Sequence, residues 1–325
     1  MTAPLLEIDD LRVTFNTRYG TVTALDGVSM NVASGETLGV VGESGCGKSI
    51  TALATMGLIP MPPGKIAGGS IRLAGEELVS ATPSRLRGLR GSDIAMIFQE
   101  PMTSLNPVFT VGSQIAEAIM LHQNVSHDQA FKDAVALLDR VGIPSPAERA
   151  KDYPHQLSGG MRQRVMIAMA VSCRPKVLIA DEPTTALDVT VQAQIFDLLN
   201  EIQRDFGAAI ILITHDMGAI SEMADRVAVM YAGRIIEAAT ADDVLDFPQH
   251  PYSRGLIDCI PALGRDERAL REIPGVVPPL HLLGAGCAFA ERCAHANDRC
   301  RTEKPLLVNH GHHPAACHAV EEGRL

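Results

Sequence analysis

The stretch TLGVVGESGCGKSITALATMG, residues 37–57, decides the fold. An apolar run ends in glycine, the next residues match the spacing G-x-x-x-x-G-K-[ST], and a helical pattern follows. Glycines let the backbone turn and approach phosphate closely, while the loop N–H groups and the helix N-terminus face the anion. The stretch therefore predicts a phosphate-binding loop (P-loop) between a buried strand and a helix of an α/β protein.

Each position of this loop is a candidate for nucleotide contact. We expect Lys48 to reach the β- and γ-phosphates of ATP and Ser49 to ligate Mg²⁺. Cys46 occupies a variable position, where the simplest interpretation is a small filler whose thiol has no role. The candidate nucleotide-binding residues of the loop are Gly42, Glu43, Ser44, Gly45, Cys46, Gly47, Lys48, Ser49 and Ile50.

Three more apolar runs end in polar residues. VLIAD ends in Asp181, which we expect to bind Mg²⁺ through water, and Glu182 follows, where it can orient the attacking water. AMIFQ ends in Gln99, a predicted sensor of Mg²⁺ and of that water, and AAIILIT is followed by His215, a predicted γ-phosphate contact. Sites of open α/β sheets form at the carboxyl ends of strands. The pattern predicts an ATPase with Glu182, His215 and Gln99 as catalytic residues and with Ser49, Gln99 and Asp181 around Mg²⁺.

The motif LSGGM at residues 157–161 opens a helical stretch. Ser158, Gly159 and Gly160 leave backbone N–H groups free at a positive helix end. This gives a second phosphate-binding surface to a chain that already has one. Its simplest use is to close over the γ-phosphate held by a partner's P-loop, so a dimer that encloses two ATP molecules follows as a hypothesis.

Composition narrows the class of protein. The 325 residues favour about two domains, and 46% hydrophobic residues suffice for a sizeable core. With 38 acidic against 28 basic residues, the net charge of −10 argues against nucleic-acid binding. The sequence shows neither a targeting segment nor an apolar run of roughly 18–20 residues. We therefore expect a cytoplasmic protein that relies on other subunits for any membrane-spanning part.

Patterning along the chain predicts its organisation. Short strands fill residues 5–41, a helical region covers about 101–174, and 225–237 reads as a hairpin with its turn at Ala232 and Gly233. Beyond the hairpin the sequence becomes rich in Pro, His and Cys and loses periodicity. We place a first domain at 1–237 and an extension at 238–325.

Four of the seven cysteines cluster in the extension with the spacing C-x5-C-x6-C-x16-C. Four thiolates on a loop-rich segment can hold tetrahedral Zn²⁺ or a [4Fe–4S] cluster, and five nearby histidines allow mixed ligation. Neither the usual zinc-knuckle nor the ferredoxin spacing is present, and uncoordinated thiols are the remaining alternative. The candidate metal ligands are Cys287, Cys293, Cys300 and Cys317.

Taken together, the P-loop, Gln99, LSGGM, ADEP, TTALD (184–188) and His215 closely resemble the ATP-binding-cassette (ABC) ATPases over residues 5–237. The resemblance implies a RecA-like P-loop nucleotide-binding domain with an antiparallel β subdomain and an α-helical subdomain. It also implies that Asp188 belongs to the loop that communicates between the two ATP sites. Tyr19 lies where the family stacks an aromatic residue on adenine, and Phe15 is a weaker candidate for that role.

A narrower resemblance covers nearly the whole chain. Residues 97–119, 153–170 and 183–195, together with HPYSRGL (250–256) and IPGVVPPL (273–280), look like the ATPase subunits of bacterial dipeptide and oligopeptide importers. The C-terminal extension of such subunits is small and loop-rich, and similar tails bind a [4Fe–4S] cluster. We therefore rank the cluster first, with a structural role, and zinc second.

The importer resemblance also implies partners. These are two transmembrane permease subunits, a second ATPase subunit that is usually a paralogue, and an extracytoplasmic solute-binding protein, with this chain on the cytoplasmic face of the membrane. Residues 100–106 are the candidate permease contact. Relatives with this extension also import nickel or glutathione, so import of a different small solute is a second hypothesis. Two competing classes of protein are a soluble ABC ATPase of DNA repair or translation and a metal-sensing regulator.

Overall fold

The computed structural model describes residues 3–100, 104–185, 187–259, 273–309 and 311–325. The chain forms two compact units, each assembled from segments that are distant in sequence. The first unit contains mainly Ser80–Ile211, and the second contains Leu6–Val32, Thr37–Val79 and Leu212–Leu325.

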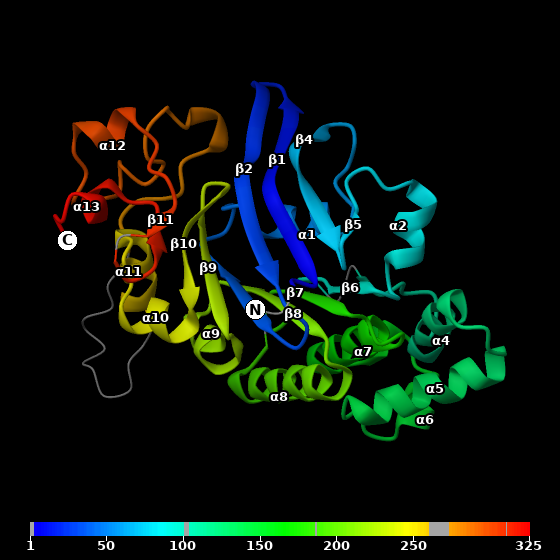
Figure 1. Cartoon of the computed structure of the whole chain (residues 1–325). Coiled ribbons are helices and arrows are strands. Elements are labelled where there is room, and N and C mark those ends of the chain that lie inside the picture. The colour runs from blue at the N-terminus through cyan, green and yellow to red at the C-terminus, as the bar shows by residue number, and fades with distance from the viewer. Residues whose placement is uncertain (1–2, 101–103, 186, 260–272, 310) are drawn as a thin grey trace. The chain divides into compact units, whose positions relative to one another are not determined.

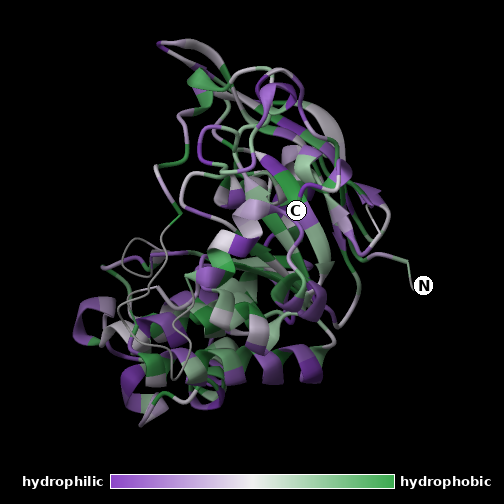
Figure 2. Ribbon diagram, turned by 90° about the vertical axis from the view of Figure 1, so that its left-hand side faces the viewer, coloured by the Kyte–Doolittle hydropathy of each residue, from purple (hydrophilic) through white to green (hydrophobic). Residues whose placement is uncertain are grey.

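The first unit is largely helical. Helices α4 (Val111–His122), α5 (His127–Arg140) and α7 (Gly159–Val171) pack against one another, and Figure 1 shows them in green. The hydropathy colouring of Figure 2 alternates along helices, as expected where each helix buries one face. The remaining elements are α2 (Pro83–Leu89), β6 (Ile94–Ile97), α6 (Pro146–Arg149), η1 (Pro154–Gln156), β7 (Val177–Asp181), α8 (Val189–Phe206) and the start of β8 (Ala209–Thr214).

Local sequence signals explain where these helices begin and end. The Ser126 hydroxyl accepts a hydrogen bond from the Gln129 N–H at 3.3 Å and caps α5. Gly142 follows that helix with φ +75°, and Gly207 ends α8 with φ +63°, a left-handed conformation that favours glycine. Glycine in the left-handed conformation thus ends both helices.

Strands β6 and β7 pair in parallel, from Ile94 beside Val177 to Ile97 beside Ala180. Every residue of both strands is buried. Parallel strands covered on both faces are expected to be continuous apolar runs, and the sequence has that pattern. The polar residues that follow these strands are therefore presented from a rigid support.

The second unit contains two sheets. An antiparallel sheet has the order β2-β1-β4-β5, and the other sheet has the order β11-β12-β10-β9-β3 within this unit. In Figure 1 the long strands β1 and β2 run beside each other in blue, next to β4. The strands are β1 (Leu6–Thr17), β2 (Gly20–Val32), β3 (Thr37–Val41), β4 (Gly64–Leu73), β5 (Glu76–Glu77), β9 (Arg226–Tyr231), β10 (Arg234–Thr240), β11 (Val308–Asn309) and β12 (Pro314–Ala315).

The predicted hairpin is confirmed as β9 and β10. Ala232 and Gly233 form its turn with φ of +46° and +79°, the signs that a two-residue hairpin turn needs to match the twist of its strands. A Cβ on Gly233 would lie 2.4 Å from the Ala24 carbonyl oxygen, so glycine is required at this position. The turn thereby joins the hairpin to β2.

The C-terminal extension is built from short elements. Its strand β12 pairs with β10 through Ala315 opposite Glu237. Glu237 is fully buried, lies 2.6 Å from His313 Nε2, and accepts the N–H groups of Gln249 and His250. These contacts fasten the extension to the hairpin, and the proposed division after residue 237 stays a prediction. The helices of this unit are α1 (Lys48–Thr55), α9 (Met217–Met223), α10 (Ala241–Asp246), α11 (Pro251–Asp258), η3 (Leu280–Leu282), α12 (Asp298–Thr302) and α13 (His318–Glu321).

Candidate functional site

The P-loop connects the buried strand β3 to helix α1. Gly42, Gly45 and Gly47 have φ of +153°, +82° and +113°. A Cβ on Gly42 would lie 2.2 Å from the Met230 carbonyl oxygen, whereas a Cβ on Gly45 would meet nothing within 4 Å. The loop is therefore packed tightly on its inner side and open where a ligand can approach its backbone.

Lys48 crosses the inside of this loop. Its side chain is buried, and its ammonium group donates to the carbonyl oxygens of Gly42 at 2.6 Å and Glu43 at 3.1 Å. Cys46 is fully buried beside it, with Sγ 3.8 Å from the Lys48 nitrogen, and burial raises the pKa of the Cys46 thiol. The lysine charge is thus held where the loop backbone turns.

In the first unit, three side chains meet after strands β6 and β7. The Gln99 amide donates to Glu182 Oε2 at 2.9 Å, and the Thr185 hydroxyl donates to the same oxygen at 2.8 Å. Glu182 has φ +47°, an uncommon left-handed conformation for a residue with a side chain. The preceding Asp181 is buried at the end of β7. Two donors and a constrained backbone therefore fix the direction of the Glu182 carboxylate.

The LSGGM motif forms the start of α7. The Ser158 hydroxyl accepts from the Met161 N–H at 3.3 Å and caps the helix. A Cβ on Gly159 would meet nothing within 4 Å, while a Cβ on Gly160 would lie 3.1 Å from Val191. The helix start is consequently open at its first glycine and packed against α8 at its second.

Asp188 lies at the start of helix α8, and His215 lies directly after strand β8. Asp188 caps α8, because its carboxylate accepts from the Val191 N–H at 2.9 Å. His215 is exposed directly after β8 and precedes Asp216, which caps α9. Each residue is thus presented by a regular element rather than by an irregular loop.

Tyr19 lies at the turn between β1 and β2 and is 61% exposed. Its ring stacks on His281 of the extension with centroids 4.7 Å apart and planes 8° apart, and the Arg18 guanidinium lies 4.8 Å from the ring centroid. Phe15 is half-buried within β1, beside Gly64 of β4. Tyr19 is the more accessible of the two predicted adenine contacts.

The four cysteines of the extension line one small cavity, together with His250, His295 and His318. Burial raises the pKa of Cys287 to about 11, and it also raises the pKa of Cys293 and of Cys317. Among the described residues, however, no three Cys, His, Asp or Glu side chains form a group that could hold a metal ion. The structure therefore does not support the predicted metal-binding character of the extension, and shows only that the four thiols line one cavity. His310, one of the histidines considered for mixed ligation, lies outside the described residues.

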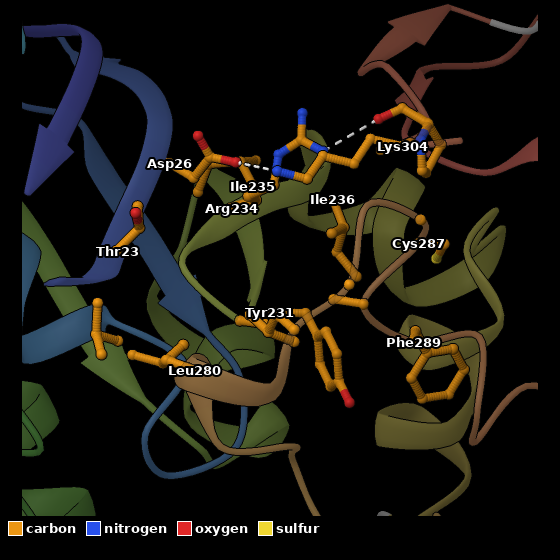
Figure 3. A pocket seen from close by; sticks show the side chains of 18 of the residues that line it. Thr23, Asp26, Tyr231, Arg234, Ile235, Ile236, Leu280, Cys287, Phe289 and Lys304 are labelled. Atoms are coloured by element: carbon orange, nitrogen blue, oxygen red, sulfur yellow. Dashed lines mark hydrogen bonds and ion pairs between the residues drawn. The ribbon is translucent and has the colours of Figure 1, made fainter. Parts of the chain in front are cut away.

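A larger pocket of about 330 Å³ lies among β2, the β9–β10 hairpin and the extension, as Figure 3 shows. At its edge Lys304 forms an ion pair with Asp26 at 2.7 Å. Burial opposes the charge of Asp26, but Lys304, with Arg234 and Arg12 nearby, holds the pKa of this carboxyl below its ordinary value. The ion pair is a further link between β2 and the extension.

Comparison with known proteins gives the site its family. Residues 25–185 match the family model described as ABC transporter, and residues 236–300 match that of the oligopeptide/dipeptide transporter C-terminal region. The chain is 53% identical to the oligopeptide transport ATP-binding protein OppD of Salmonella typhimurium, with 93% of this chain and 90% of that protein aligned. This chain is an ABC transporter ATP-binding protein. It is also 50% identical to AppD of Bacillus subtilis, with 94% and 93% covered.

Solved structures agree with this ABC fold. The dimeric ATP-binding cassette MJ0796, in a post-hydrolysis state with ADP and phosphate, matches with a TM-score of 0.66 over 73% of this chain and 98% of that one, at 24% identity. The cassette cbiO1 of Clostridium perfringens matches with a TM-score of 0.63 at 29% identity, over 76% and 92%. The predicted α/β ATPase fold is confirmed. No helix among the described residues is long and apolar enough to cross a bilayer.

The structure also brings in residues that the sequence did not single out. Thr185 was part of a recognised stretch, yet its contact with Glu182 was not predicted. Tyr252 and Arg292 of the extension reach Glu43 of the P-loop, and no local sequence signal points to that contact. Of the predicted permease contact at 100–106, residues 101–103 lie outside the described part of the chain.

Proposed function

We propose that this ABC ATPase powers the import of dipeptides or oligopeptides. In this proposal it works at the cytoplasmic face of the membrane with two permease subunits, a second ATPase subunit and an extracytoplasmic solute-binding protein. The supporting observation is the identity of about half of all residues to proteins named for oligopeptide transport, across more than nine-tenths of this chain. The match of residues 236–300 to the oligopeptide/dipeptide transporter C-terminal region supports the same solute class.

Within that function, the P-loop holds the phosphates of ATP. The open side of Gly45 leaves room for phosphate beside loop N–H groups, and the buried Lys48 supplies positive charge next to them. On binding, the Lys48 ammonium exchanges its two carbonyl contacts for phosphate oxygens. Ser49 and Asp181 are the proposed ligands of Mg²⁺, directly and through water respectively. When bound there, Mg²⁺ would neutralise charge on the phosphate oxygens during hydrolysis.

Glu182 is the proposed residue that orients the attacking water. Its carboxylate is already held by Gln99 and Thr185, so little reorganisation is needed when substrate arrives. Gln99 is suited to sense Mg²⁺ and water, because its amide contacts the carboxylate that does the positioning. His215 is the proposed γ-phosphate contact, and Tyr19 is the proposed stacking partner of adenine.

Ser158, Gly159 and Gly160 are proposed to close on the nucleotide of the second ATPase subunit. Gly159 has open space where a Cβ would be, so a phosphate group from outside the chain can approach the start of α7. Asp188 is the proposed link between the two nucleotide sites, since it caps the helix that packs on Gly160 through Val191.

For the extension, we propose a [4Fe–4S] cluster held by its four cysteines. The four thiols line one cavity, and burial disfavours the free thiolates of Cys287, Cys293 and Cys317, which a bound cation would stabilise. Zn²⁺, which four thiolates can also hold, is the second candidate. Anaerobic purification with iron, sulfide and zinc determination tests this assignment. Near-stoichiometric iron and sulfide that are lost on Cys293→Ser support the cluster, and protein without metal overturns it.

The importer function is tested in vesicles that contain the permease subunits, the second ATPase and the solute-binding protein. We expect labelled dipeptide or oligopeptide uptake that needs ATP and is lost with Glu182→Gln, while ATP binding is retained. Hydrolysis should fall by roughly 10²–10³-fold in that variant. Uptake of nickel or glutathione in place of peptide would overturn the solute class, and ATPase activity that never associates with the permease would favour a soluble ABC ATPase.

A further inference from the structure

Two side chains of the C-terminal extension hold a residue of the P-loop. The Arg292 guanidinium donates to both carboxylate oxygens of Glu43, at 2.7 and 3.0 Å. The Glu43 backbone N–H donates to the Tyr252 hydroxyl oxygen at 2.7 Å. We call these three residues the P-loop clasp. Glu43 is thereby held through both its side chain and its backbone.

Arg292 is itself fixed from several sides. Its side chain is only 5% exposed, and its Nε donates to the Pro274 carbonyl oxygen at 2.7 Å. Its Nη1 also donates to the Tyr231 hydroxyl at 3.3 Å. The contact with Glu43 raises the pKa of Arg292, so the guanidinium stays charged. An arginine that donates two hydrogen bonds to one carboxylate is specific in geometry, and lysine cannot reproduce this arrangement.

The clasp is continuous with the cysteine cavity. Arg292 directly precedes Cys293 in sequence, and Phe289 lines the cavity that the four cysteines share. The Phe289 ring packs edge-on against Tyr252, with centroids 5.5 Å apart, and lies 5.7 Å from the Arg292 guanidinium carbon. Figure 3 shows Phe289 beside Tyr231 and Cys287. One set of packed side chains thus joins the cysteine segment to the phosphate-binding loop.

We propose that Arg292 and Tyr252 are positioning residues for nucleotide binding, and that they couple the P-loop to the cysteine segment. Glycine loses more conformational freedom on folding than other residues, so the glycine-rich P-loop needs contacts from its surroundings to stay ordered, and the clasp supplies such contacts at Glu43. Coupling between two sites is reciprocal. Nucleotide at the P-loop therefore protects the segment around Cys293 from opening, and loss of order there weakens nucleotide binding. The inference goes beyond peptide import, since it requires only that the chain bind ATP.

The test compares two arginines that occupy equivalent places in sequence. Arg292 precedes Cys293 and reaches the P-loop, whereas Arg299 precedes Cys300 and pairs with Glu303, Glu321 and Glu322. Both substitutions, Arg292→Gln and Arg299→Gln, are made in the full chain, purified without oxygen. We expect Arg292→Gln to weaken binding of a non-hydrolysable ATP analogue roughly tenfold, and Arg299→Gln to leave it within about twofold.

Hydrogen–deuterium exchange provides a readout that a general loss of stability would not reproduce. In the unsubstituted chain and in Arg299→Gln, the ATP analogue should slow exchange in peptides that cover residues 287–293. In Arg292→Gln, saturating analogue should leave those peptides unprotected, while peptides of the P-loop are still protected. Equal affinities in the two variants, or nucleotide-independent exchange of 287–293 in the unsubstituted chain, would overturn the proposal.

A milder pair of variants covers the case in which Arg292→Gln does not fold. Tyr252→Phe keeps the ring and removes the hydroxyl that accepts from the Glu43 N–H. Arg292→Lys keeps the positive charge but loses the pair of N–H groups that donate to both Glu43 oxygens. Each should reduce nucleotide affinity, by roughly fivefold, with unfolding temperatures near that of the unsubstituted chain. Unchanged affinity in both folded variants contradicts the clasp. These measurements need no permease or peptide, so their outcome is independent of the peptide-import proposal.

Discussion

Two glycine-rich segments of this protein each open a helix, but their glycines are required for different reasons. In the P-loop, a Cβ on Gly42 would lie 2.2 Å from a backbone oxygen of the chain itself, and φ is +153°. At the start of α7, a Cβ on Gly159 would meet nothing within 4 Å. The first glycine satisfies a constraint within the fold. The second has no internal reason to be glycine, which is expected if its constraint comes from a ligand or a partner.

The two segments also differ in how the first turn of each helix is capped. Helix α1 begins at Lys48 and its N-cap, Gly47, offers no side-chain cap, so the P-loop is instead held by Lys48 and by the extension. Helix α7 has its own serine cap and does not depend on such support. The loop proposed to bind phosphate therefore receives its support from distant segments, whereas the motif proposed to meet a partner has a cap within its own helix.

The largest expected effect is that of Gly42→Ala. The added methyl collides with the Met230 carbonyl oxygen in a backbone region that alanine avoids, so we expect a loss of at least about 3 kcal/mol in the free energy of unfolding. Denaturant unfolding measures it. Gly88→Ala is the control, because a Cβ there meets nothing within 4 Å inside α2, where alanine should stabilise by about 0.5–1 kcal/mol. Equal stabilities of the two variants would remove the distinction drawn above.

Gly159→Ala should have the opposite profile. Stability should change by no more than about 0.5 kcal/mol, because the methyl enters open space. ATP hydrolysis by the assembled transporter should fall roughly 100-fold, since the methyl would displace the partner's nucleotide from the helix start. Steady-state ATPase rates and thermal unfolding of the same preparations check both halves. Full activity would mean that the open face of α7 contacts no phosphate.

Ser158→Ala tests the cap of the same helix. Loss of the hydroxyl that accepts from Met161 should cost about 1 kcal/mol in the free energy of unfolding. Ser126→Ala at α5 removes an equivalent cap, also at 3.3 Å, and should cost a similar amount. Only Ser158→Ala should also lower the ATPase rate of the assembled transporter. Equal activities would assign Ser158 to the fold alone.

The smallest effect concerns the ion pair between β2 and the extension. Asp26 has a pKa held below its ordinary value, so its contribution to stability is complete above the unfolded-state pKa of about 3.9 and disappears as pH falls through the lower native pKa. Because Lys304 is about half exposed, Asp26→Asn should cost less than about 1 kcal/mol at pH 7. The difference in unfolding temperature between Asp26→Asn and the unsubstituted chain should therefore be smaller at pH 3 than at pH 7. A difference that grows on acidification would contradict this assignment.

Much of the fold could be predicted because its signals are local. The apolar run before Gly42 is a buried strand, the turn at Ala232 and Gly233 is a hairpin, and Gly207 ends a helix. These outcomes follow from spacing, burial and backbone preference within a few residues. The ABC class was likewise predictable, since its motifs are short segments whose chemistry depends on residue type and order.

Pairing of distant side chains was not predictable. Gln99 and Glu182 were both expected beside the attacking water. That Gln99 and Thr185 donate to the same oxygen of Glu182 was not, because this contact depends on how β6 and β7 align. The four cysteines were expected to hold a metal because they cluster on a loop-rich segment that resembles cluster-binding tails of related importers. The structure shows that they line one cavity, and this arrangement is set by the short helices and turns that carry them.

The sequence by itself determined that this protein is an ABC ATPase with a P-loop, a signature helix and a cysteine-bearing extension. Only the tertiary structure decided that Arg292 of the extension forms hydrogen bonds with Glu43 of the P-loop, because these two residues are 249 positions apart. Periodicity and motif spacing reflect the energetics of neighbouring residues, whereas a contact over such a separation arises only when both segments pack on the same strands. The β9–β10 hairpin is that common support, since β9 pairs with β3 before the P-loop and β10 pairs with β12 of the extension.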